Sequence, residues 1–509
     1  MVPRHALPPC TAPSRLSTAH RPGRPWDAGT VPAGRHRTSR VLAGRRGEPA
    51  GRRAAVLRVA VVGSGPSGVY TAQGLVRQSR VPDVRVHVLD RLPCPYGLVR
   101  YGVAPDHEKI KSLQEHLRTV LEDERIEFLG HVEVGAHGLC PRRLLGLYHA
   151  VVYCVGAARD RRLGIPGEDL PGSRSATDFV SWYSAHPDAP GDGFGFPVRS
   201  AVVIGAGNVA VDVTRVLARE PGALRATDMP EGVLAALARS GVREVHMVGR
   251  RGPSQARFTT KELRELGALP AAAVRVHPAD LALDPAYTDA SVAAALPAAV
   301  RRNLDVVRDW AARGARGADE GRDPCRVRVR FFLRPVELLE RDGAVGAVRF
   351  ERTGPDGAGG VRGTGAYEEI EAQLVLRAVG YQGVPLPGLP FDTRRGTVPH
   401  AAGRVVRDGA PSPGEYVAGW IKRGPTGVIG SNRPCAKETV ASLLDDAGAL
   451  ARRSVADDPL AELRAAGHRP VRWAGWEAIV AAEATLGHRL GRGTVKIPDW
   501  PGLLAAAGP

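Results

Sequence analysis

Residues 59–68 read Val-Ala-Val-Val-Gly-Ser-Gly-Pro-Ser-Gly, an apolar run that breaks into the pattern Gly-x-Gly-x-x-Gly. The run predicts a short buried strand, and the residues after Gly68 favour a helix. Glycines at 63, 65 and 68 permit a tight turn, close approach of the backbone to a pyrophosphate, and close packing of the helix on the strand. The stretch therefore predicts a dinucleotide-binding turn in an α/β fold.

A second apolar strand is expected at residues 84–89, directly before Asp90. Asp90 comes 22 residues after Gly68. An acidic residue about 20 residues beyond such a turn accepts hydrogen bonds from the ribose hydroxyls of a bound dinucleotide. The alternative is a solvated acid at a strand end, but the context favours the ribose contact.

Composition limits the kind of protein. The 509 residues are enough for two or three domains. No stretch approaches the roughly 18 apolar residues of a membrane span, so we expect no transmembrane segment. The formal net charge is +17, and residues 1–56 supply +9 of it through 11 Arg against two acids. The rest of the charge is spread over a body without a recognisable nucleic-acid module, which favours an acidic protein partner over nucleic acid.

The cysteines and the N-terminal residues bear on the cellular compartment of the protein. Six cysteines lie far apart without a Cys-x-x-Cys, which favours a reducing compartment and leaves no ligands for a disulfide relay, an iron–sulfur cluster or zinc. Residues 1–56 are rich in Arg, Pro and Gly, and we expect a disordered extension. We expect a cytoplasmic protein, of bacterial origin because Arg far exceeds Lys. The mitochondrial matrix is the alternative, since transit peptides are also Arg-rich.

Residues 202–210 repeat the first signature as Val-Val-Ile-Gly-Ala-Gly-Asn-Val-Ala. Two such signatures predict two bound nucleotides. The strand expected at 244–248 is followed by Gly-Arg250-Arg251 instead of an acid. Paired guanidinium groups suit a nucleotide with an additional 2′-phosphate, and a solvated Arg pair is the alternative. An added helical segment at 221–240 accounts for the long interval before Arg250.

The remaining chain is less informative. Residues 271–322 are Ala-rich and predict surface helices, whereas residues 326–332 and 344–350 predict strands that flank a turn at Asp342-Gly343. Residues 374–381 mirror residues 151–156, and both resemble the strands by which proteins with two nucleotide domains pass from one domain to the other.

A third motif is more specific. Residues 95–107 read Pro-Tyr-Gly-Leu-Val-Arg-Tyr-Gly-Val-Ala-Pro-Asp-His, too rich in Gly and Pro for a regular element. Together with the first glycine turn, this loop resembles the adrenodoxin reductase family of FAD-containing ferredoxin–NADP reductases. The resemblance implies two Rossmann-like three-layer α/β domains, with an NADP domain at residues 158–380 inserted into an FAD domain at 57–157 and 381–509.

The resemblance also implies site residues. It supports FAD contacts at Gly63, Gly65, Ser67, Gly68, Asp90, Leu98, Val134, Trp420, Gly427, Val428 and Ile429. It supports NADP(H) contacts at Gly205, Ala206, Gly207, Asn208, Val209, Arg250, Arg251 and Glu262. Candidate catalytic residues are His107, Asp212 and Glu262. A structural His107, an Asp212 that complements a helix dipole and a Trp420 in the core are the alternatives.

The activity implied by the resemblance is reduction of a ferredoxin or adrenodoxin-like acidic iron–sulfur protein by NADPH, carried out by a monomer without a metal site. A flavin is needed because NADPH gives a hydride whereas the cluster accepts one electron at a time. A quinone reductase or monooxygenase that shares both nucleotide sites is one alternative. A non-catalytic NADPH-responsive module, or an electron-transfer subunit of a larger complex, is another.

Overall fold

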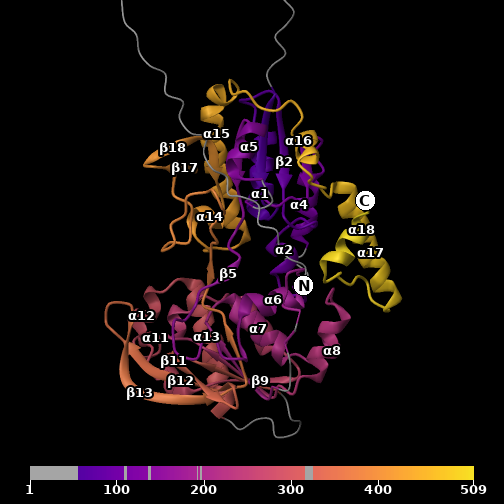
Figure 1. Ribbon diagram of the computed structural model, residues 1–509. Helices are drawn as coiled ribbons and strands as arrows, with labels where there is room; N and C mark the ends of the chain where they lie inside the picture. Colours follow the sequence, from indigo (N-terminus) through magenta and orange to yellow (C-terminus); the bar gives the residue numbers. More distant parts are fainter. Residues whose placement is uncertain are drawn as a thin grey trace, which may run out of the picture.

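The structure is a computed structural model that describes residues 56–107, 112–135, 139–191, 193–194, 198–315 and 325–508. The extension expected at residues 1–56 lies outside the described residues, except for Val56. Two sheets dominate the fold, and Figure 1 shows the body that holds α1, β2, β18 and α15 above the body that holds α6, α7, β9 and β12. The expectation of two Rossmann-like α/β domains is confirmed.

The first sheet takes strands from both ends of the chain. Its order is β16-β17-β18-β4-β1-β2-β3, and β1 pairs in parallel with both β2 and β4. Its strands are β1 (Leu57–Val62), β2 (Val84–Leu89), β3 (Ile126–Leu129), β4 (Ala150–Tyr153), β16 (His400–Ala401), β17 (Arg404–Arg407) and β18 (Ala410–Val417). The apolar side chains of β1 alternate between two cores, one of which packs against α1 (Pro66–Arg77) and α15 (Asn432–Leu450).

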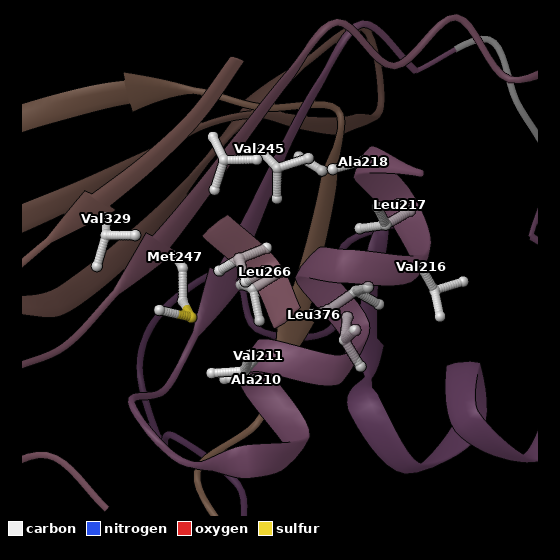
Figure 2. Packing of buried hydrophobic residues seen from close by; sticks show 14 of the residues in the cluster. Ala210, Val211, Val216, Leu217, Ala218, Val245, Met247, Leu266, Val329 and Leu376 are labelled. Atoms are coloured by element: carbon white, nitrogen blue, oxygen red, sulfur yellow. The ribbon is translucent and has the colours of Figure 1, made fainter. Parts of the chain in front are cut away.

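The second sheet lies wholly between these two groups of strands in the chain. Its order is β6-β14-β7-β8-β10-β9, with every pairing parallel. Its strands are β6 (Ser173–Ser175), β7 (Ser200–Ile204), β8 (Glu244–Val248), β9 (Ala272–Val276), β10 (Cys325–Arg330) and β14 (Leu374–Arg377). Figure 2 shows the core on one face, where Val211 and Leu266 meet Val245, Met247 and Leu376 of the sheet.

The other face of the second sheet is covered by a smaller antiparallel sheet. This sheet consists of β11 (Leu333–Arg341), β12 (Ala344–Pro355) and β13 (Val361–Glu371). Leu338, Val348 and Phe350 from it share a buried cluster with Val202 and Val248. Helices on one face and a second sheet on the other therefore make three layers.

The described residues form further helices and three short 3₁₀ turns. They are α2 (Leu98–Tyr101), α4 (Leu113–Leu121), α5 (Pro141–Leu147), α6 (Ala176–Tyr183), α7 (Asn208–Ala218), α8 (Glu231–Arg239), α9 (Thr260–Gly267), α10 (Pro278–Ala282), α11 (Pro285–Thr288), α12 (Ala290–Ala295), α13 (Ala298–Ala315), α14 (Trp420–Arg423), α16 (Pro459–Ala465), α17 (Trp473–Arg489) and α18 (Trp500–Ala507), with 3₁₀ turns η1 (Pro221–Leu224), η2 (Pro253–Gln255) and η3 (Ile429–Ser431). In the described part of the chain, no helix is both long and apolar enough to cross a membrane.

Two expectations about local structure were only partly right. The hairpin turn at Asp342-Gly343 joins β11 to β12, whereas the predicted partner strand at 326–332 belongs to the parallel sheet as β10. A positive φ of 56° at Phe332 separates β10 from β11. The helices expected within residues 271–322 are present as α10 to α13, but the segment begins with β9, which pairs with β10 at the sheet edge. Tertiary pairing decided both cases, because strand preference depends on the neighbouring strand.

The half built on the first sheet and the half built on the second sheet are joined at several places, among them three main-chain connections. β5 (Arg159–Asp160) and β15 (Tyr381–Gln382) lie on the outgoing and returning chain segments, and they pair with each other antiparallel. The third connection is the segment after α17, where Lys496 N donates to Asp228 O at 3.0 Å. Figure 1 shows α17 and α18 in yellow at the side of the molecule.

Candidate dinucleotide sites and the interface between them

The first glycine turn joins β1 to α1. Gly63 has a φ of 107°, and a Cβ there would lie 2.6 Å from Cys154 O. A Cβ on Gly68 would overlap Gly63 O, whereas Gly65 has only Gly97 Cα near it, at 3.9 Å. Two of the glycines therefore allow close packing of strand and helix, and Gly65 leaves space beside the N-terminus of α1, where unpaired N–H groups attract phosphate.

Asp90 follows β2 and holds this turn in shape. Its carboxylate accepts hydrogen bonds from Ser64 N at 2.8 Å, Ser64 Oγ at 2.5 Å and Leu92 N at 2.9 Å. Burial raises the pKa of Asp90, and the hydrogen bonds from Ser64 and Leu92 offset part of that effect. The predicted ribose contact of Asp90 stays a prediction, but the residue lies beside the turn as the spacing required.

Two loops lie against the first turn. Tyr96 N donates to Ser64 O at 3.1 Å, which places the loop that carries Leu98 over the turn. From the other end of the chain, a Cβ on Gly419 would overlap Ser67 Oγ. The structure thus brings three distant segments together: the turn, the 96–98 loop, and Gly419, which leads into the loop from Trp420 to Ile429.

The surfaces of these loops suit an aromatic ligand with polar edges. Leu98 is 37% exposed and Val428 is 67% exposed, although both are large and apolar. Trp420 starts α14, and its Nε1 is buried without a hydrogen-bond partner among the residues described. Val134 lies in the loop after β3 and is 8% exposed. An apolar surface beside a phosphate turn, with an indole N–H that lacks a partner, fits FAD.

The second glycine turn joins β7 to α7. Gly205 has a φ of 152°, and a Cβ there would overlap Ala378 O, whereas nothing lies within 4 Å of a Cβ on Gly207. Asn208 begins α7, and its Oδ1 accepts a hydrogen bond from Thr259 N at 2.8 Å. Ala206 and Val209 pack against the core of this half. The turn is therefore open toward the helix N-terminus, as a pyrophosphate requires.

Arg250 and Arg251 follow β8, on the strand next to the second turn. The loop that carries them is fixed, because Asp284 Oδ2 accepts from Ser254 N at 2.8 Å and Thr353 Oγ1 donates to Arg250 O at 2.9 Å. Within the described ranges, neither guanidinium group has a carboxylate partner within ion-pair distance. Two unpaired cations at this place fit the 2′-phosphate of NADP(H).

Sequence reasoning missed a third cation, Arg257. Its backbone forms a parallel bridge with Gly207, and Arg257 N donates to Ala206 O at 2.8 Å. Its side chain is exposed. Burial, followed by the charges of Arg250 and Arg257, lowers the pKa of Arg251, so the three cations act on one another. The sequence carried no signal for Arg257, because only the fold returns this segment to the glycine turn.

The Arg257→Ala variant is expected to weaken binding of NADP⁺ and NAD⁺ by a similar factor, about tenfold. The reason is that Arg257 is bridged to the turn that we expect to hold the pyrophosphate, which both nucleotides carry. Calorimetric titration measures the two affinities, with Arg394→Ala as a control on a distant exposed arginine. A loss confined to NADP⁺ would instead assign Arg257 to the 2′-phosphate, and unchanged affinities would remove it from the site.

An ion-pair cluster joins the two halves between the turns. His107 follows the loop of the first half, and its Nε2 lies 2.9 Å from Asp212 Oδ1 and 3.0 Å from Glu262 Oε2. Asp212 is on α7 and Glu262 is on α9, so the three candidate catalytic residues do meet. Arg215 lies among them, with Nη2 2.8 Å from Asp212 Oδ1 and Nη1 2.8 Å from Glu265 Oε2.

The charged groups of this cluster indicate whether it is a metal site or an ion-pair network. His107, Glu262 and Glu265 could each offer a metal ligand, but Arg215 Nη2 lies 2.7 Å from His107 Nε2 and already occupies the cluster. Burial alone would lower the pKa of His107, yet the neighbouring carboxylates of Asp212 and Glu262 outweigh it and raise the pKa to about 9. We therefore interpret the cluster as an ion-pair network with a protonated histidine.

This raised pKa predicts how the contribution of His107 to stability depends on pH. A histidine whose pKa is about 9 when folded and 6.5 as a free group stabilises the fold fully below pH 6.5, and this contribution is lost as the pH rises through 9. The melting temperature of His107→Gln should therefore lie furthest below that of the parent protein under pH 6.5. Scanning calorimetry from pH 6 to about 9.5 checks this. A difference that stays constant or grows with pH would contradict the protonated state.

The fold and the sites together define an oxidoreductase with two dinucleotide-binding domains. A sequence profile of the pyridine nucleotide-disulphide oxidoreductase family matches residues 57–267. The five cysteines in the described ranges are all free: Cys94, Cys140, Cys154, Cys325 and Cys435.

More specific similarity extends over most of the chain. NADPH-ferredoxin reductase FprA of Mycobacterium tuberculosis is 44% identical over 461 residues, which cover 88% of this chain and 98% of that protein. The mitochondrial NADPH:adrenodoxin oxidoreductase of Arabidopsis thaliana is 38% identical over 467 residues, covering 89% and 95%. The solved structure of M. tuberculosis FprA in complex with NADPH superposes with a TM-score of 0.82 at 42% identity, covering 89% and 99%. The chain belongs to this family of NADPH-ferredoxin and adrenodoxin reductases.

Proposed function

We propose that this chain is an FAD-containing ferredoxin–NADP reductase, which uses NADPH to reduce a ferredoxin-type iron–sulfur protein. The observation that carries the proposal is the pair of glycine turns on two separate sheets, joined at an interface where His107 meets Asp212. We place the FAD domain at residues 57–157 and 381–509 and the NADP domain at 158–380.

The residues of the chain have distinct tasks in this proposal. The turn at Gly63–Gly68, with Asp90 beside it, holds FAD, and the loop from Trp420 to Ile429 covers the ring system. The turn at 205–209 and the arginines after β8 hold NADPH. Bound FAD accepts a hydride and releases electrons singly, which a one-electron iron–sulfur acceptor requires.

The cluster of His107, Asp212 and Glu262 lies where the nicotinamide and flavin sites approach each other. We assign it two tasks: to fix the orientation of the two domains and to keep a proton at His107 Nε2. Fixed positioning of the two reacting rings can account for much of the rate enhancement in a hydride transfer.

We further propose an acidic ferredoxin as the partner, a monomeric enzyme and a bacterial cytoplasmic location. The formal charge of +17 supports an acidic partner because opposite charge speeds association. The bacterial relative FprA supports the location. Size-exclusion chromatography with light scattering tests the monomer.

The function is tested by adding NADPH to the purified yellow protein without oxygen. The proposal predicts that the flavin absorbance is lost within the time of one catalytic turnover and that an added ferredoxin is then reduced by one electron. NADH should be a much less effective reductant than NADPH. Oxygen consumption stoichiometric with NADPH, and no reduction of any ferredoxin, would instead support a monooxygenase. A colourless protein, or a flavin that NADPH does not bleach, would contradict the proposal.

A further inference from the structure

Arg423 is the last residue of α14, and it makes contacts unlike those of any ion-paired arginine described above. Its Nη1 donates to Gly424 O at 3.2 Å and to Thr426 O at 2.6 Å. Its Nη2 donates to Ser431 Oγ at 3.2 Å and to Asn432 Oδ1 at 2.9 Å. One guanidinium group thus binds both ends of the 424–432 loop.

The other contacts of the loop continue the same pattern. Ser431 Oγ donates to Val428 O at 2.6 Å, and Asn432 Nδ2 donates to Ile429 O at 3.0 Å. The carbonyl groups of the loop are therefore directed inward, onto Arg423 and the first residues of α15. The N–H groups of Gly427 and Val428 have no acceptor among the described residues, and both residues are exposed.

A loop with bound carbonyl groups and unbound N–H groups offers donors to a ligand. Gly419, just before α14, lies against the first glycine turn, since a Cβ on it would overlap Ser67 Oγ, and Asn432 Oδ1 at the end of the loop lies 3.7 Å from the same point. Gly427 has a φ of 83°, and a Cβ there would overlap Ser431 Oγ, so the fold of the loop depends on a glycine as well as on Arg423.

The charge of Arg423 is also uncompensated. Among the residues that the structure describes, no carboxylate lies within ion-pair distance of its guanidinium group, and its contacts are all neutral oxygens. Its side chain is half-buried, so water screens the charge only in part. A positive charge beside a flavin favours the reduced form, which carries more negative charge.

We propose that Arg423 is a positioning residue for the flavin: it folds the 424–432 loop so that its N–H groups face a ligand, and its charge raises the reduction potential of that ligand. The inference rests on the proposed function, in which this loop covers FAD. Arg423 acts through the loop, so it is not a catalytic residue.

Two variants separate the effect of the loop geometry from the effect of the positive charge of Arg423. Arg423→Lys keeps the positive charge but cannot bind four acceptors. Arg423→Gln loses both the charge and the contacts with the four acceptors. Each is expected to raise the Kd for FAD at least tenfold, measured by titrating the apoprotein with FAD. The midpoint potential of the bound flavin should fall in Arg423→Gln and stay near that of the parent protein in Arg423→Lys, measured against a redox dye.

Arg433→Gln is the matched control. Arg433 is near the start of α15, is exposed, and contacts His116 and the Tyr70 ring instead of the loop. The Arg433→Gln variant should leave both the Kd for FAD and the midpoint potential of the bound flavin unchanged.

Three results would overturn the role of Arg423: an unchanged Kd and potential in Arg423→Gln; equal potentials in the two Arg423 variants; or an equal fall of melting temperature in apoprotein and holoprotein without a change in Kd. These outcomes differ from a failure of the proposed function, in which NADPH would not reduce the parent protein.

Discussion

Replacing both Arg250 and Arg251 with Ala is expected to lower kcat/KM for NADPH at least about a hundredfold, because each charged hydrogen bond contributes about 1.5–3 kcal/mol. The value for NADH should change by less than about threefold, since NADH lacks the 2′-phosphate that we propose these residues bind. The two residues follow β8, on a loop that Asp284 and Thr353 hold in place. Initial rates with the two reductants, and calorimetric titration with NADP⁺, measure the effect.

The matched control is the double replacement of Arg394 and Arg395. This pair is exposed on a loop of the other half, so its removal changes the net charge equally without touching the second turn. It should leave both rates within about twofold, which excludes loss of general electrostatic attraction. Equal losses for NADPH and NADH in the Arg250/Arg251 variant would show that these residues do not read the 2′-phosphate.

The second large effect is expected from Glu483→Ala. Glu483 Oε1 accepts from Arg100 Nη2 at 2.6 Å and from Ile497 N at 2.9 Å, and both charged side chains are 5% exposed. Removing one member of a buried pair leaves the other charge without a partner, which costs about 3–5 kcal/mol of unfolding free energy. Chemical denaturation of the holoprotein measures this loss.

Two further variants test the cause. Glu477→Ala changes an exposed glutamate on the same helix and should cost less than about 1 kcal/mol. The double variant Arg100→Met with Glu483→Leu should recover most of the stability, because apolar residues of similar volume often replace a buried ion pair at little cost. If the double variant is no more stable than Glu483→Ala, the loss does not come from the unpaired charge.

Local patterns in the sequence predicted the turns and the class of fold. Each glycine turn follows a strand of β-branched residues, and that order is enough to predict a nucleotide site. The interval between the second turn and Arg250 also predicted the extra helical segment, which the structure has as η1 and α8. These features depend on residues close together in the chain.

Features that depend on distant residues were not predictable. Arg257 reaches the second turn through a single bridge to Gly207, and the sequence does not encode that return in any pattern. Arg215 was missed for the same reason, since its partners Asp106 and Glu265 come from different halves. The resemblance assigned His107, Asp212 and Glu262 to one catalytic site, but only the fold showed the arginine that lies among them.

The divided order of the first sheet has a consequence for synthesis of the chain. Strands β1 to β4 leave the ribosome early, but β18, which pairs with β4, follows only after the whole second sheet. Until then, β4 is an open strand edge that other chains could pair with. We therefore expect the second sheet to fold before the first sheet is complete.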